Sequence, residues 1–131
     1  MTNFITFKIN NNLKIAIKES SILSFQTLTK THKQRLNFGS KNDFGYLSLT
    51  QGIHLILDLE SILEVEKTSL KNIVVLLNNK KIAFIVEVVE SITPIHEDNI
   101  FDSLVSNDHF DKYFKNSSHE VIPIFDIDLL L

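Results

Sequence analysis

One short stretch, SNDHFDKYF at residues 106–114, brings together residue types that bind divalent metals. Asp108, His109 and Asp111 supply two carboxylates and an imidazole, and these groups ligate transition metals in proteins. Three ligands within four residues crowd one another around a single ion. We therefore interpret the stretch as a polar loop beside a strand and predict no metal site, with a metal-binding or metabolite-binding loop as the alternative.

His54 is the other candidate for acid–base chemistry. It lies among apolar neighbours in GIHLIL, and no carboxylate at a recognisable spacing marks a partner, so we interpret it as a half-buried strand histidine. The sequence lacks the GxxxxGK[ST], HExxH and GxSxG motifs that carry phosphate binding, metalloproteolysis and acyl transfer. These features predict no catalytic residue, no cofactor and no enzymatic activity.

Two aspartates stand directly after apolar runs. Asp58 follows LIL and precedes LESIL, and Asp126 follows PIF and precedes IDLLL. A carboxylate at such a position accepts backbone N–H groups of a following helical turn, which stabilises the corner by typically ~1 kcal/mol. The recurrence favours this structural role over a catalytic or metal-binding one.

The surrounding elements are predicted to be strands. Residues 4–9 and 13–17 alternate apolar and polar side chains, as half-buried strands do. Residues 72–77 and 82–89 form a second pair, and each pair is joined by an asparagine-containing turn. Ile22 with Phe25, three residues apart, predicts a short helical turn after the first pair, capped by Ser20 or Ser21.

Phenylalanine is the abundant large apolar residue, with ten copies and no tryptophan. Those within strand patterns are predicted to lie in the core; they are Phe4, Phe7, Phe84 and Phe125. Others fall in or beside loops, where they cover the ends of the fold or serve as anchors for a partner; they are Phe38, Phe44, Phe101, Phe110 and Phe114.

The order of elements repeats along the chain. Each half runs hairpin, loop, apolar strand and aspartate, and Asp58 corresponds to Asp126, 68 positions later (126 minus 58). Two such units predict a mainly β protein of two SH3-like five-stranded β-barrel subdomains packed side by side, with short helical turns. We place the subdomains at residues 1–66 and 67–131 and allow strand exchange at the termini.

Charge is unevenly distributed within a net charge of −3. Residues 1–41 carry seven Lys or Arg and one acid, whereas residues 97–131 carry two and eight. The stretch from Lys30 to Lys41 is interpreted as a solvated basic loop, with steering of an acidic partner as the alternative. The overall acidity argues against nucleic acid as a partner. No apolar run reaches the length of a membrane span, and MTNFITFKIN is unlike a signal peptide, so we predict a cytoplasmic protein without membrane insertion.

The segment FGYLSLTQGIHLILDLESIL resembles a stretch of the CheW-like chemotaxis coupling proteins that runs Gly-x-x-Asn-Leu-Arg-Gly-x-x-x-Pro-x-x-Asp-Leu. The two align without a gap from Gly45 to Leu59. KKIAFIVEVVESI is similar to that family's Gly-(Leu/Ile)-x-Val-Asp-x-Val, and VIPIFDIDLLL to its closing Leu-Asp-x-x-x-Leu-Leu. The resemblance therefore covers nearly the whole chain.

The resemblance implies a non-enzymatic adaptor that couples chemoreceptors to a CheA-type histidine kinase in chemotaxis. Its implied partners are the kinase regulatory domain and the cytoplasmic tip of a chemoreceptor. The residues expected to contact them are Ile22, Ser24, Phe25, Leu49, Thr50 and Gln51. The alternative is a small β-barrel that binds a metabolite or metal through the His109 loop and the crevice between the barrels.

This chain departs from the family pattern at the Asn-Leu-Arg-Gly segment. Ser48, Leu49, Thr50 and Gln51 stand there, and Thr50 lacks the fixed charge and the fork of donors of the family arginine. A divergent member that binds the kinase but not standard receptors is therefore a variant of the hypothesis. Gly52, one residue later, can supply the turn that the family glycine makes.

Overall fold

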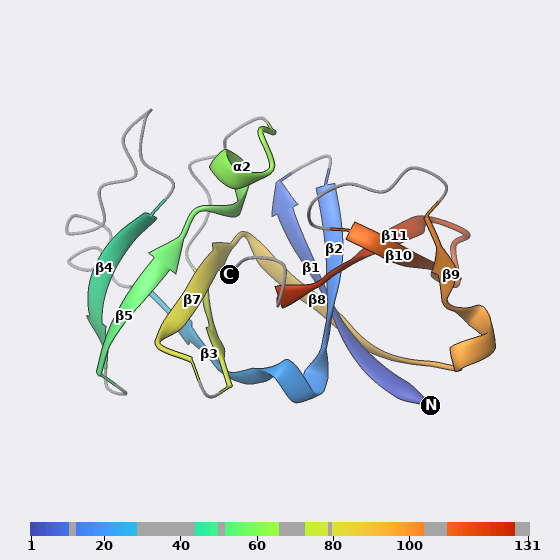
Figure 1. Ribbon diagram of the computed structural model, residues 1–131, viewed down its shortest axis with the longest axis horizontal. Helices are drawn as coiled ribbons and strands as arrows, with labels where there is room; N and C mark the ends of the chain where they lie inside the picture. The colour runs from blue at the N-terminus through green and yellow to red at the C-terminus, as the bar shows by residue number, and fades with distance from the viewer. Residues whose placement is uncertain are drawn as a thin grey trace.

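The computed structural model describes residues 1–10, 13–28, 44–49, 52–65, 73–78, 80–103 and 110–127. They form two sheets that lie side by side, with very little helix (Figure 1). The six-stranded sheet has the order β8 (Val88–Ile95), β1 (Thr2–Asn10), β2 (Leu13–Lys18), β11 (Val121–Phe125), β10 (Phe110–Lys115) and β9 (Phe101–Asp102). The five-stranded sheet has the order β3 (Ile22–Thr27), β6 (Ile73–Leu77), β7 (Ile82–Val86), β5 (Gly52–Leu57) and β4 (Phe44–Leu49). The helical elements are η1 (Glu19–Ser21), α2 (Leu59–Ile62) and η2 (Glu97–Asn99).

The predicted mainly β architecture is confirmed. The pairing among the described residues leaves each sheet with two edge strands, so the finer description as closed SH3-like barrels stays a prediction. Within the part of the chain that the structure describes, no helix is long and apolar enough to cross a bilayer.

Each sheet combines a hairpin from one half of the chain with strands from the other half. The β1–β2 hairpin pairs with β8 and β11, and the β6–β7 hairpin pairs with β3 and β5. The two assemblies match residue by residue, because Ile124 lies beside Ala16 in a parallel pair just as Ile56 lies beside Ala83. The subdomain boundary after residue 66 stays a prediction, together with the strand exchange that it allows.

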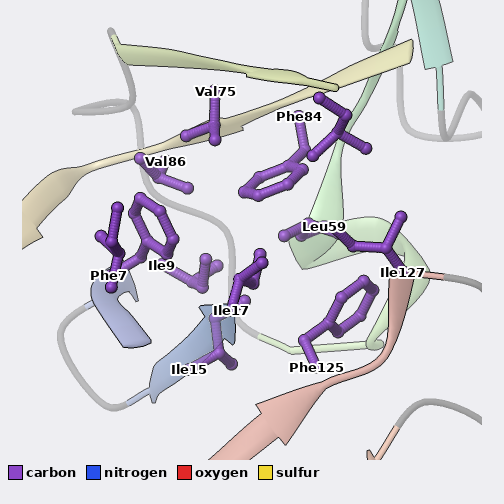
Figure 2. Close-up of a cluster of buried hydrophobic side chains, with 12 residues drawn as sticks. Phe7, Ile9, Ile15, Ile17, Leu59, Val75, Phe84, Val86, Phe125 and Ile127 are labelled. Atoms are coloured by element: carbon purple, nitrogen blue, oxygen red, sulfur yellow. The ribbon is translucent and has the colours of Figure 1, made fainter. Parts of the chain in front are cut away.

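Both hairpins are largely buried on both faces, which explains the nearly continuous apolar sequences of β6 and β7. Strand β1 is more deeply buried than its alternating sequence predicts, because Thr6 is also buried. One face of each hairpin packs into a central core between the sheets (Figure 2). The core also contains Ile5 and Leu77, and Figure 2 labels its other buried residues: Phe7, Ile9, Ile15, Ile17, Leu59, Val75, Phe84, Val86, Phe125 and Ile127. The opposite faces pack into a smaller cluster within each sheet, around Ala83 in one and Ala16 in the other. Alternation along a strand thus sends successive side chains to different cores.

Two local predictions are wrong. Ile22 and Phe25 belong to strand β3, which pairs with β6, and the helical turn is the preceding η1, whose N-cap is Lys18 without a side-chain cap. The predicted strand 82–89 is two strands, because the chain leaves one sheet after β7 and enters the other at β8. Glu87 sits at this crossing, where its N–H donates to the Lys8 carbonyl oxygen at 3.0 Å.

The four phenylalanines predicted for the core, at positions 4, 7, 84 and 125, are confirmed as buried. Of the loop set, Phe114 is buried in β10, Phe110 is half-buried and Phe101 is 43% exposed. Phe38, the side chain of Phe44 and the basic stretch Lys30–Lys41 lie outside the described residues.

Candidate protein interface

Strand β3 carries three of the predicted contact residues at an edge of the five-stranded sheet. Ile22 is half-buried against the central core. Phe25 is 41% exposed, and its ring meets that of Phe7 edge-on with centroids 5.9 Å apart. Leu23, in the irregular step of the strand, is 53% exposed. This edge therefore presents exposed apolar side chains beside residues that pack against the central core.

Ser24 is the third predicted contact, and it is not exposed. It lies opposite Leu76, whose side chain belongs to the cluster within the five-stranded sheet. Directly opposed residues of paired strands share a face. Its Oγ is buried and, among the described residues, has no hydrogen-bond partner. The position of Ser24 fits a role in shaping the strand better than direct contact with a partner.

The other predicted group belongs to the β4–β5 hairpin, at the opposite edge of the same sheet. The backbone of Leu49 ends β4 opposite Gly52, whose φ of +118° suits glycine. Thr50 and Gln51, between them, lie outside the described residues, as does the Leu49 side chain. No backbone pairing joins this turn to β3, because β6, β7 and β5 intervene.

The outer face of this hairpin holds two exposed residues that the sequence did not single out. Tyr46 is 64% and Ile53 is 68% exposed, and each has its cross-strand partner in the hairpin, Leu55 and Ser48 respectively. The signal for them was the mainly apolar character of GYLSL and GIHLIL. The alternation of side chains along a strand does not show which of them are covered by another element.

His54 lies in strand β5 and Asp58 caps the start of α2, as predicted. His54 is buried, more deeply than expected, with Nδ1 3.0 Å from the Gly52 carbonyl oxygen, where a protonated Nδ1 donates. Asp58 is 1% exposed, and its Oδ1 accepts the Glu60 N–H at 3.2 Å at the start of α2. The corresponding cap at Asp126 stays a prediction, because the chain after Ile127 lies outside the described residues.

A pocket of about 490 Å³ opens between the two sheets. Its apolar lining consists of Ile17, Leu77, Ile124, Phe125 and Ile127, and its polar lining consists of Lys18, Ser20, Ser21, Asn78, Lys80, Asp111, Lys112 and Asp126. Asn78, directly after β6, is bonded to the segment directly before β3 at this pocket. Its backbone N–H donates to the Ser21 carbonyl oxygen at 2.9 Å and its side-chain amide to the Ser20 carbonyl oxygen at 3.1 Å.

The predicted polar loop contributes Asp111, an exposed residue of β10 that lines this pocket. Asp108 and His109 lie outside the described residues. Among the described residues, no group of three His, Cys, Asp or Glu side chains is arranged to hold a metal ion.

Comparison with known proteins gives a match in structure and none in sequence. No family model matches the sequence, and no curated protein matches it. The chain is similar to the crystal structure of the scaffolding protein TtCheW from Thermoanaerobacter tengcongensis, with a TM-score of 0.74 and 14% sequence identity. The match covers 96% of this chain and 89% of that chain. The resemblance to CheW-like proteins is thus confirmed at the level of the fold.

Proposed function

We propose that this protein is a divergent CheW-like adaptor that couples chemoreceptors to a CheA-type histidine kinase in the cytoplasm, without chemistry of its own. The observation that carries the proposal is the fold shared with a CheW scaffolding protein over 96% of the chain. The sequence motifs quoted from both halves support it independently of the coordinates. The exposed apolar side chains at both edges of the five-stranded sheet are the kind of anchors that a binding surface needs.

The kinase regulatory domain is the partner that we propose for these edges. Phe25 on one edge and Ile53 on the other are exposed and belong to regular strands, so docking there needs no ordering of the backbone. Thr50 replaces the family arginine in the β4–β5 turn. We therefore propose that receptor tips bind more weakly than the kinase does, because a bidentate charged contact is missing.

Capture assays with purified full-length chain test this function. Immobilised kinase regulatory domain and immobilised receptor tip are offered separately, and we expect capture by the kinase domain. Phe25→Ala or Ile53→Ala should each weaken binding by about tenfold or more if the residue is an interface anchor. Ile92→Ala, at a 58% exposed position on β8, is the matched control and should bind like the parent. Capture by neither partner contradicts the proposed function.

We also propose that each sheet curls into a small SH3-like barrel. The separate buried clusters around Ala83 and Ala16, one within each sheet, support this arrangement. An experimental structure in which the edge strands of each sheet approach one another would establish it.

The pocket between the sheets favours a second candidate function, the binding of a small metabolite. Its size lies within the range of ligand sites, and both Lys18 and Asp111 line it. A thermal-shift screen distinguishes the two functions. Stabilisation by one compound that is lost in Asp111→Ala and His109→Ala supports a ligand-binding protein, whereas a flat screen together with kinase capture supports the adaptor.

A further inference from the structure

The pocket between the two sheets is lined by charged residues of both signs together with apolar ones. Its charged lining consists of Lys18, Lys80, Lys112, Asp111 and Asp126. Its apolar lining includes Ile17, Leu77 and Phe125, which belong to the central core. A ligand with a single charge meets a like charge in this lining. The lining therefore favours an occupant that carries both charges and an apolar group.

Two charged side chains of the lining have no partner within the described part of the chain. Lys112 is engaged, because its Nζ lies 3.3 Å from Asp102 Oδ1. The side chains of Lys18 and Asp111 make no ion pair or hydrogen bond with each other or with any other described residue. Two opposite charges therefore line one pocket without neutralising each other.

The six-stranded sheet places Lys18 and Asp111 on either side of β11. Lys18 ends β2 and Asp111 belongs to β10, and β11 lies between these strands. Two strand spacings amount to about 10 Å, a separation that one small ligand spans together with the long lysine side chain. The ends of β2, β11 and β10 thus present a positive and a negative group to the same occupant.

Asp111 stands at an irregular step of its strand. Phe110 lies opposite Phe125, and Lys112 lies opposite the neighbouring Ile124, so Asp111 is the extra residue of a β-bulge. Bulges are over-represented beside active sites, where they change the direction of a side chain. The bulge distinguishes Asp111 from an acid that merely belongs to the regular exposed face of a strand.

We propose that the intersheet pocket binds a zwitterionic α-amino acid with an aliphatic side chain. Its carboxylate contacts Lys18, its ammonium contacts Asp111, and its side chain packs against Ile17 and Leu77. Hydrogen bonds between charged groups are stronger than neutral ones, so both charges of the ligand contribute to selection. The inference names the ligand class for the second candidate function, the binding of a small metabolite, and rests on it.

Titration of the isotope-labelled full-length chain with three matched probes tests the proposal. The probes are L-leucine, 4-methylpentanoate, which lacks the ammonium group, and 3-methylbutylamine, which lacks the carboxylate. We expect L-leucine to shift amides at the pocket ends of β2, β10 and β11 and to bind about tenfold or more tightly than either analogue. In Lys18→Met, L-leucine should bind no better than 3-methylbutylamine. In Asp111→Asn, it should bind no better than 4-methylpentanoate.

Lys115→Met and Glu97→Gln are the matched controls, because both residues are exposed and neither lines the pocket; the affinity for L-leucine should be unchanged. The exposure of Lys18 and Asp111 allows their variants to fold, and an unchanged amide spectrum away from the pocket verifies this. The proposal is overturned if either analogue binds as tightly as L-leucine, or if Lys18→Met and Asp111→Asn both bind like the parent.

The thermal-shift screen separates failure of this inference from failure of the metabolite function. If L-leucine causes no shift but another compound stabilises the chain at the pocket, the proposed ligand class is wrong and metabolite binding stands. If L-leucine causes no shift and the screen is flat, both are contradicted.

Discussion

The β4–β5 and β10–β11 hairpins occupy equivalent places in the two sheets, yet they present different surfaces. Strand β5 of one runs parallel to β7 of the β6–β7 hairpin, and β11 of the other runs parallel to β2 of the β1–β2 hairpin. Tyr46 opposes Leu55 in one as Tyr113 opposes Pro123 in the other. Ile53 and Val121, again at matching positions, are both exposed. The repeated backbone thus offers the same apolar positions to solvent at both ends of the molecule.

The difference lies in the turns and in the charges. Leu49 opposes Gly52 across a two-residue turn, whereas Lys115 opposes Val121 across five residues. Asn116 closes the longer turn by accepting the Ser118 and Glu120 N–H groups on its Oδ1, both at 2.9 Å. Residues 44–49 and 52–57 contain no Asp, Glu, Lys or Arg, whereas residues 110–125 contain Asp111, Lys112, Lys115 and Glu120. The strand pairing is therefore repeated, and the two hairpins differ in their turns and in their charged residues.

The largest expected effect concerns the shared core beneath both hairpins. Phe84 follows Ala83, which pairs with β5, and Ile17 follows Ala16, which pairs with β11. Both Phe84 and Ile17 are fully buried in the central core. Phe84→Ala should lower the free energy of unfolding by about 3–5 kcal/mol and Ile17→Ala by about 2–5 kcal/mol, because each leaves a cavity. Denaturant unfolding followed by circular dichroism measures both losses.

Both variants should unfold in one transition, since the β1–β2 and β6–β7 hairpins of the two sheets pack in one central core. Two separate transitions, with Phe84→Ala moving only one of them, would show that the two ends of the molecule are energetically independent. That outcome would contradict the idea that the two sheets are stabilised by one shared core.

A smaller effect is expected at the two equivalent aspartates. Asp58→Ala should cost about 1–2 kcal/mol, because it removes the cap of α2 and leaves the Glu60 N–H buried without that acceptor. Asp126→Ala should cost less, because Asp126 is only half-buried. The same denaturant experiment measures both, and an equal or larger loss at Asp126 would contradict this ordering.

The smallest effect concerns the pH response of the β10–β11 turn. The hydrogen bond from the Asn116 amide, 3.2 Å from Glu120 Oε1, lowers the pKa of Glu120, and Lys14 at 3.5 Å lowers it further. A lowered carboxyl pKa adds stability above the unfolded-state pKa, and this contribution is lost as pH falls through the folded-state value. Hydrogen bonding to Glu90 raises the pKa of Lys14, so that contribution is lost only at strongly alkaline pH.

An NMR titration of the Glu120 carboxyl checks this order of causes. Asn116→Ala should raise the pKa of Glu120 more than Lys14→Met does, and added salt should weaken only the effect of Lys14. A larger rise of the Glu120 pKa in Lys14→Met than in Asn116→Ala would mean that the ion pair with Lys14, and not the hydrogen bond from Asn116, is the main cause of the lowered pKa. The β4–β5 turn, whose described residues Leu49 and Gly52 are uncharged, offers no comparable group.

Alternation and turn residues were sufficient to predict both central hairpins, their buried phenylalanines and the Asp58 cap. They were insufficient at the sheet crossings. The sequence from Ile82 to Val89 predicts one strand, because its apolar pattern does not change at Glu87. What changes there is the neighbouring strand, which is β6 before Glu87 and β1 after it. The spacing of Ile22 and Phe25 suited a helix equally well, and pairing with β6 decided for a strand.

The candidate interface was harder to predict than the fold. Phe25 was identified and is exposed, whereas Ser24 is turned toward a buried cluster. The exposure of Tyr46, Ile53 and Phe101 depends on which parts of each sheet are covered by the rest of the chain. That limit is set by contacts between residues far apart in sequence, which periodicity within a strand does not record.

The hydrogen bonds of Asn78 to the carbonyl oxygens of Ser20 and Ser21 have a mechanical consequence. They fasten the end of β6 to the connection through which the chain passes from β2 to β3. These bonds continue the pairing of Ile22 with Leu77 by one step, so the segment that leads into β3 and the end of β6 form one hydrogen-bonded part of the pocket wall.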